Sequence, residues 1–145
     1  MRPIQRVAVL GSGVMGAGIA AHLANCGIPS LLLDRVPPGT GPTADERNGL
    51  ALAARRNLPK AKPAPLFLVH AIDLITVGNF EDDLHRVTGC DWIIEAVTED
   101  LDVKRALLGA VAKHRRPGSL VSTNTSGISW APTSSIPRAT SSCLS

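Results

Sequence analysis

The chain has 145 residues, 44% of them hydrophobic and 19% charged, and its formal net charge at pH 7 is +3. A chain of this length folds as one domain and buries about 70% of its unfolded surface. The small net charge and the 3% of aromatic residues argue against nucleic-acid binding, which needs a basic surface and aromatic platforms. No run of about 18 apolar residues is present, so the sequence offers no membrane-spanning helix.

The three cysteines, Cys26, Cys90 and Cys143, are odd in number and widely spaced. Such a set is typical neither of a disulfide framework nor of a metal site, and it fits a reducing cytoplasm. The four histidines are also scattered and show no ligand spacing, so we expect no metal. The first apolar run begins within a few residues of Met1, which leaves no room for a signal peptide. We therefore expect a cytoplasmic protein.

Residues 6–34 carry the most informative pattern in the chain. An apolar run ends at Leu10, the segment GSGVMG follows at 11–16, and a helical pattern extends over residues 14–26. A second apolar run then closes on Asp34. This order of strand, glycine turn, helix, strand and acidic residue is that of a dinucleotide-binding βαβ unit.

Each glycine of this turn has a physical task in such a unit. Gly11 permits the tight turn, Gly13 lets the backbone approach a pyrophosphate, and Gly16 lets the helix pack closely on the strand. The pyrophosphate would lie on N–H groups at the positive end of the helix dipole, which makes Val14 and Met15 cofactor-binding positions as well. The alternative is a fold of this type that has lost its ligand.

Asp34 lies about 20 residues beyond the turn, where an acidic side chain accepts hydrogen bonds from the adenosine ribose. A carboxylate at this position repels a 2′-phosphate, so we expect the cofactor to be NAD rather than NADP. The neighbouring Arg35 could accommodate a 2′-phosphate, but we interpret it as a solvated loop residue.

The remaining elements alternate along the chain. A Pro/Gly-rich loop is expected at 36–42, helices at 43–58 and 99–115, a short helix or turn at 81–87, and strands at 31–33, 75–77, 92–97 and 120–123. The buried stripes of the first and last helices are expected at Met15, Ile19 and Leu23, and at Leu101, Leu107, Leu108 and Val111. The unbroken apolar run at 31–33 is typical of a strand that is covered on both faces.

Strands that alternate with helices predict an α/β fold, a Rossmann-type doubly wound and mostly parallel sheet. Ligands bind such sheets outside the carboxyl ends of the strands. The glycine turn, Asp34 and residues 96–99 and 124–126 all follow strands, so we expect them to converge on one crevice. This domain is expected to occupy residues 1–131, and the Ser/Thr-rich segment 132–145 is expected to be disordered.

Three stretches, VAVLGSGVMGAGIAAHLANCGI, DWIIEAVTEDLDVKRALL and STNTSGI, carry a resemblance to a known family. Over roughly residues 4–130 the chain resembles the N-terminal, NAD-binding domain of the 3-hydroxyacyl-CoA dehydrogenase family. The Pro-rich loop and the stretch ITVGNFEDDL are similar to the bacterial branch, in which this domain begins a longer β-oxidation protein. The resemblance implies oxidation of a (3S)-3-hydroxyacyl-CoA to 3-oxoacyl-CoA, with hydride passed to NAD, by a protein that is a homodimer in full-length form.

The same resemblance implies roles for particular residues. Those at Ala96, Glu99 and Lys104 would line the cofactor beside the nicotinamide ribose, and Asn124 would approach the nicotinamide. Ser126 matches the catalytic serine, which hydrogen-bonds the 3-oxygen of the substrate and orients it for hydride transfer.

Without the resemblance, plainer interpretations stay open for these residues. Glu99 and Lys104 could be ordinary charges on an exposed helix, and residues 124–126 could be turn chemistry after a strand. Glu95, near a strand end, is interpreted as a structural carboxylate rather than as a general base.

The resemblance stops before the catalytic histidine of the family, which sits in an HFF-type segment about twenty residues beyond the position of Ser126. The helical domain that follows in the family is also absent from this sequence. We therefore expect a truncated or single-domain product that binds NAD but turns over acyl-CoA poorly or not at all. Two alternatives remain: another NAD-dependent hydroxyacid dehydrogenase, such as the 6-phosphogluconate type, and a non-catalytic NAD-sensing or interaction module.

Overall fold

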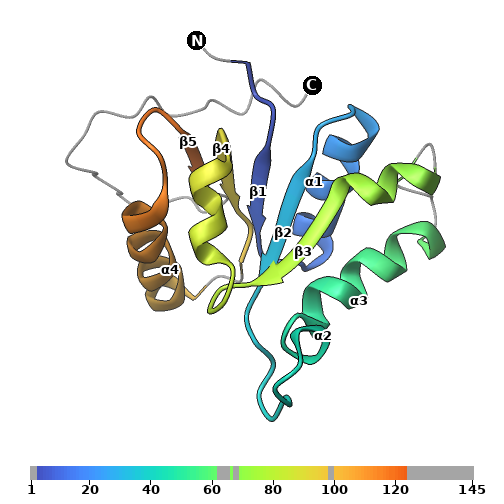
Figure 1. Cartoon of the computed structure of the whole chain (residues 1–145), viewed down its shortest axis with the longest axis horizontal. Helices are drawn as coiled ribbons and strands as arrows, with labels where there is room; N and C mark the ends of the chain where they lie inside the picture. Colours follow the sequence, from blue (N-terminus) through green and yellow to red (C-terminus); the bar gives the residue numbers. More distant parts are fainter. Residues whose placement is uncertain (1–2, 62–65, 67–68, 98–99, 124–145) are drawn as a thin grey trace.

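The computed structural model describes residues 3–61, 66, 69–97 and 100–123. Its centre is a five-stranded, all-parallel sheet with the strand order β3-β2-β1-β4-β5 (Figure 1). The strands are β1 Val7–Leu10, β2 Ser30–Asp34, β3 Ile75–Asn79, β4 Trp92–Glu95 and β5 Leu120–Thr123. Successive strands are added first on one side of β1 and then on the other, which confirms the Rossmann-type doubly wound fold.

Helices cover both faces of the sheet, with α1 and α3 on one side and α4 on the other (Figure 1). The α-helices are α1 Val14–Asn25, α2 Ala44–Arg47, α3 Gly49–Asn57 and α4 Leu101–His114. Three short 3₁₀ segments, η1 Leu58–Lys60, η2 Val69–Leu74 and η3 Leu84–Gly89, lie in the connections. Among the described residues, no helix combines the length and apolar character needed to cross a membrane.

The two faces of the sheet belong to two separate hydrophobic clusters. Val7 and Val9 of β1 pack in the cluster that includes α1 and α3, whereas Ala8 and Leu10 pack in the cluster that includes η3 and α4. All four residues are completely buried. This two-sided burial explains why the strands are unbroken apolar runs rather than alternating patterns.

The buried stripe predicted for the first helix is wrong in part. Met15 is 51% exposed and Ile19 is only partly buried, whereas Leu23 is buried. The packed face consists instead of small residues around Leu23, namely Gly16, Ala20, Ala21 and Ala24. Small side chains allow the helix axis to approach the sheet closely, so the bulkiest side chains do not mark the inner face here.

The last helix also begins differently from the prediction. It starts at Leu101, because the Asp100 side chain accepts hydrogen bonds from the amides of Asp102 and Val103 and caps it. Leu101 in this first turn is 44% exposed and does not belong to the core. The other three residues of the predicted stripe, Leu107, Leu108 and Val111, are buried as expected.

The single helix predicted for residues 43–58 is two helices. Thr43 and Glu46 form a reciprocal capping box that begins α2, and α2 ends after one turn. Asn48 leaves the helical conformation between α2 and α3, and its side-chain oxygen accepts a hydrogen bond from Asn79. This contact with a distant strand, followed by the poor helix former Gly49, accounts for the break.

Candidate cofactor-binding site

The carboxyl ends of β1, β2, β4 and β5 lie side by side at one edge of the sheet. Leu10 of β1 is in register with Leu33 on one side and with Glu95 on the other, and Glu95 is in register with Thr123. The glycine turn and Asp34 therefore share this edge with Ala96 at the end of β4. The strand order reverses between β1 and β4. Doubly wound sheets bind dinucleotides at the carboxyl ends of the strands on either side of such a reversal.

Two glycines of the turn are required by the packing of the protein itself. Gly11 has φ +104°, and a Cβ there would lie 2.7 Å from the carbonyl oxygen of Ala96. A Cβ on Gly16 would overlap the carbonyl oxygen of Gly11. Both residues let α1, the turn and the end of β4 approach one another more closely than any side chain permits.

Gly13 is different, because a Cβ at this position would meet no atom within 4 Å. It is the N-cap of α1, and no acidic residue lies in the first turn of that helix. Val14 and Met15, which follow it, are 98% and 51% exposed. The space left here, at the positive end of a helix dipole, fits the close approach of a pyrophosphate to the backbone.

Asp34 is held beside the glycine turn by three donors. Its Oδ2 accepts hydrogen bonds from the backbone amide of Ser12, at 2.8 Å, and from the Ser12 hydroxyl. Its Oδ1 accepts a hydrogen bond of 2.7 Å from the amide of Arg35. Arg35 itself is exposed. The carboxylate expected to meet the adenosine ribose is therefore oriented by groups of the protein itself.

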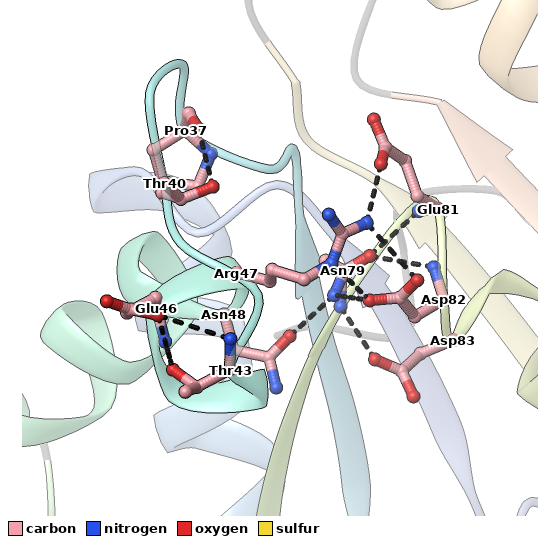
Figure 2. Close-up of polar contacts among 10 residues, drawn as sticks. All are labelled: Pro37, Thr40, Thr43, Glu46, Arg47, Asn48, Asn79, Glu81, Asp82 and Asp83. Atoms are coloured by element: carbon pink, nitrogen blue, oxygen red, sulfur yellow. Dashed lines mark hydrogen bonds and ion pairs between the residues drawn. The ribbon is translucent and has the colours of Figure 1, made fainter.

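A polar network after β3, which sequence analysis missed, fixes the neighbouring part of this edge (Figure 2). Asn79, in register with Asp34, is 1% exposed, and its Oδ1 accepts hydrogen bonds from the amides of Glu81 and Asp82 at 2.9 and 2.7 Å. Its Nδ2 donates to Asn48 and to the Asp82 carboxylate. The asparagine that ends the run ITVGN was the available signal, since its side chain readily forms such turns.

Arg47 of α2 completes this network from the other side. Its guanidinium lies 2.6 Å from the Glu81 carboxylate and donates to both oxygens of Asp82, at 2.7 and 3.2 Å (Figure 2). These contacts raise the pKa of Arg47 and, together with the Asn79 amide, lower the pKa of the Asp82 carboxyl. The helix after β2 and the turn after β3 are thereby joined.

Lys104 and Glu95 form an ion pair inside the protein. Both side chains are completely buried, and Nζ lies 3.5 Å from Oε1. The interpretation of Lys104 as an ordinary exposed charge is therefore wrong: on α4 it points inward. Glu95 is a structural carboxylate, as expected.

Three of the predicted site residues, Glu99, Asn124 and Ser126, lie outside the described residues. So do the expected domain boundary at residue 131 and the Ser/Thr-rich segment 132–145. Ala96 is described: its amide donates to the Leu10 carbonyl at 2.7 Å, which sets the end of β4 against the glycine turn.

A doubly wound sheet with this glycine turn, the open backbone at Gly13 and the anchored carboxylate of Asp34 defines a dinucleotide-binding domain. The sequence profile of the 3-hydroxyacyl-CoA dehydrogenase NAD-binding domain matches residues 6–141. The chain therefore belongs to the 3-hydroxyacyl-CoA dehydrogenase family as an NAD-binding domain.

Individual relatives agree with this assignment. A probable 3-hydroxyacyl-CoA dehydrogenase of Bacillus subtilis is 50% identical over 136 residues, which cover 87% of this chain and 17% of that protein. A protein of the same description from Deinococcus radiodurans is 46% identical over 125 residues, covering 86% and 35%. The crystal structure of 3-hydroxybutyryl-CoA dehydrogenase from Escherichia coli superposes with a TM-score of 0.67 at 30% identity, covering 88% of this chain and 26% of that one. The chain thus spans about a third or less of these proteins.

Proposed function

We propose that this chain supplies the cofactor half of an enzyme that oxidises (3S)-3-hydroxyacyl-CoA to 3-oxoacyl-CoA. The observation that carries the proposal is the pairing of the open Gly13 backbone with the anchored Asp34 carboxylate in a domain of this family. NAD, when bound, supplies the hydride acceptor. The chain's own residues bind and orient it.

The residues divide between the two halves of the cofactor. Gly11, Gly13 and Gly16, with the amides of Val14 and Met15, would cradle the pyrophosphate, and Asp34 would hold the adenosine ribose. Ala96, Glu99, Lys104 and Asn124 would serve the nicotinamide half. Ser126 would hydrogen-bond the 3-oxygen of the acyl-CoA and orient it.

Proton transfer in the family relies on a histidine in an HFF-type segment, and the 145 residues contain no such segment. We propose that a full-length protein with this domain is a homodimer. We also propose a cytoplasmic location, which the scattered cysteines support. The chain by itself would then bind NADH without turning over acyl-CoA at a rate within ~100-fold of an ordinary ~10 s⁻¹.

The first test is a titration of the purified chain with NADH, following energy transfer from Trp92 and Trp130 to the nicotinamide. Saturable binding is expected, and Asp34→Ala should abolish it. Asp73→Ala is the matched control, since Asp73 is 80% exposed and lies before β3, at the opposite edge of the sheet. A folded chain that does not bind NADH would refute the proposal.

The substrate class needs a second experiment. A chimera in which this chain replaces the matching part of the Deinococcus radiodurans protein should oxidise 3-hydroxybutyryl-CoA with NAD, and Ser126→Ala should slow it at least tenfold. A chimera that binds NADH but leaves a panel of 3-hydroxyacyl-CoA esters unchanged would contradict the proposed substrate while sparing the cofactor assignment.

A further inference from the structure

We propose that Glu95 is a positioning residue for the nicotinamide half of NAD. Its buried carboxylate joins α4 to the ends of β4 and β5, and so sets the two strand-end segments that this half of the cofactor meets. The inference rests on NAD binding by this domain.

The Glu95 carboxylate has one partner in each of three segments. Oε1 accepts a 2.9 Å hydrogen bond from the Val97 amide, in the turn that leaves β4, and lies 3.5 Å from Nζ of Lys104 on α4. Oε2 accepts a 2.7 Å hydrogen bond from the Thr123 hydroxyl at the end of β5. One side chain therefore fixes three backbone segments relative to one another.

Burial makes this arrangement rigid. Glu95 and Lys104 are both 0% exposed, and a charge without water is tolerated only with a close opposite charge and hydrogen bonds. Such a pair adds little net stability compared with apolar packing, but neither partner can shift without leaving the other uncompensated. Both carboxylate oxygens have hydrogen-bond or ion-pair partners, so Glu95 is suited to hold the three segments in place.

The strand order decides which half of the cofactor these segments meet. Asp34 ends β2 on one side of β1, whereas Glu95 ends β4 on the other side. A dinucleotide lies across this reversal point, so with the adenosine ribose at Asp34 the nicotinamide half reaches the ends of β4 and β5. Two partners of Glu95, the Val97 amide and the Thr123 hydroxyl, lie at these ends.

The experiment compares NADH with ADP, which contains only the adenosine and pyrophosphate part. Glu95→Gln keeps the shape of the side chain and removes its charge. We expect it to weaken NADH binding to the full chain at least tenfold, with ADP affinity within twofold of wild type, in calorimetric titrations. Unchanged NADH affinity, or an equal loss for both ligands, would overturn the proposal. The proposal would also be overturned if wild-type protein bound NADH no more tightly than ADP. If wild-type protein bound neither ligand, the cofactor site itself would be refuted.

Thr123→Val tests the same idea without disturbing the ion pair. It removes the Thr123 hydroxyl, which donates a hydrogen bond to Oε2 of Glu95. We expect the affinity for NADH to fall about threefold and the affinity for ADP to stay unchanged. Thr123→Ser keeps the hydroxyl and should behave like wild type. If Glu95→Gln fails to fold, this pair of variants decides: equal NADH affinity in Thr123→Val and Thr123→Ser would overturn the proposal.

Asp91 offers a matched control at the other end of the same strand. Its Oδ2 accepts hydrogen bonds from the amides of Gln5 and Arg6, just before β1, and its Oδ1 pairs with Arg116, between α4 and β5, so it too joins neighbouring segments. Asp91→Asn should lower the melting temperature and leave both ligand affinities unchanged. A loss of NADH affinity in Asp91→Asn as large as in Glu95→Gln would show that any weakened strand connection has this effect, and the specific role of Glu95 would be refuted.

Discussion

Gly16 rests directly on Gly11: a Cβ on the first would overlap the carbonyl oxygen of the second. The first turn of α1 is thereby pressed against the turn that leaves β1. Gly13, between them in sequence, has no such contact within 4 Å. The motif thus contains two glycines, Gly11 and Gly16, that the packing of the fold requires, and one, Gly13, at which the fold leaves room for a side chain.

Gly16→Ala is expected to destabilise the domain by about 1–3 kcal/mol or more, because backbone atoms must move to admit the methyl group. Thermal unfolding measures the change. Gly18→Ala is the control in the same helix, since its Cβ would meet nothing within 4 Å, and it should stabilise the helix by up to about 1 kcal/mol. Equal melting temperatures for the two variants would contradict the packing described for Gly16.

Gly13→Ala, in contrast to Gly16→Ala, should affect cofactor binding and not stability. The stability of the variant should stay within about 1 kcal/mol of wild type, which is the scale of a helix N-cap change. NADH affinity should fall at least tenfold, because the added methyl group occupies the space through which the pyrophosphate approaches. Calorimetric titration checks this. A variant that binds NADH as tightly as wild type would place the pyrophosphate elsewhere.

Asp34→Asn addresses the choice between NAD and NADP. The amide keeps the size of the side chain but removes the charge that repels a 2′-phosphate and weakens the hydrogen bonds to the ribose, which are worth about 1.5–3 kcal/mol when charged. NADH affinity should fall about tenfold or more, while the NADPH-to-NADH affinity ratio rises. A ratio that does not change would assign discrimination to other residues.

The Glu95–Lys104 pair predicts non-additive effects on stability. Lys104→Met should cost about 3–5 kcal/mol, since it leaves a buried carboxylate without its counter-charge. The double variant Glu95→Gln with Lys104→Met should regain most of that loss, because it buries no charge. Denaturant unfolding of wild type, the two single variants Lys104→Met and Glu95→Gln, and the double variant gives the coupling free energy between the two side chains. Additive losses would show that the two groups act independently.

Stability should depend on acid pH through Arg47 and Asp82. Arg47 lowers the pKa of Asp82 in the folded state, so the pair stabilises the protein above the unfolded pKa of about 3.9 and loses this contribution as pH falls through the lowered value. Arg47→Gln should therefore lower the melting temperature at pH 7 and have a smaller effect near pH 2–3. The exposed Arg56 gives the control Arg56→Gln, for which we expect little difference at either pH.

The sequence by itself determined the fold class and the cofactor, and its resemblance to known proteins indicated the family. Local patterns suffice for the fold class and the cofactor, because the turn after β1, the unbroken apolar strands and the spacing to Asp34 are all properties of a short stretch of chain. The same local logic placed the bounds of β5 correctly and predicted the core positions Leu107, Leu108 and Val111 on α4.

Only the tertiary structure decided which side chains meet across the sheet. Lys104 lies on the same face of α4 as the buried Leu107 and Leu108, where a charged side chain is not expected, and it is accommodated there because Glu95 from β4 supplies its counter-charge. Asn48 and Asn79 meet over a sequence separation of 31 residues, and their contact divides a helix that is continuous by local pattern. The inner face of α1 follows from how closely the helix lies on the sheet and not from the size of its side chains. Each of these outcomes depends on a partner distant in the chain, whose position no local pattern contains.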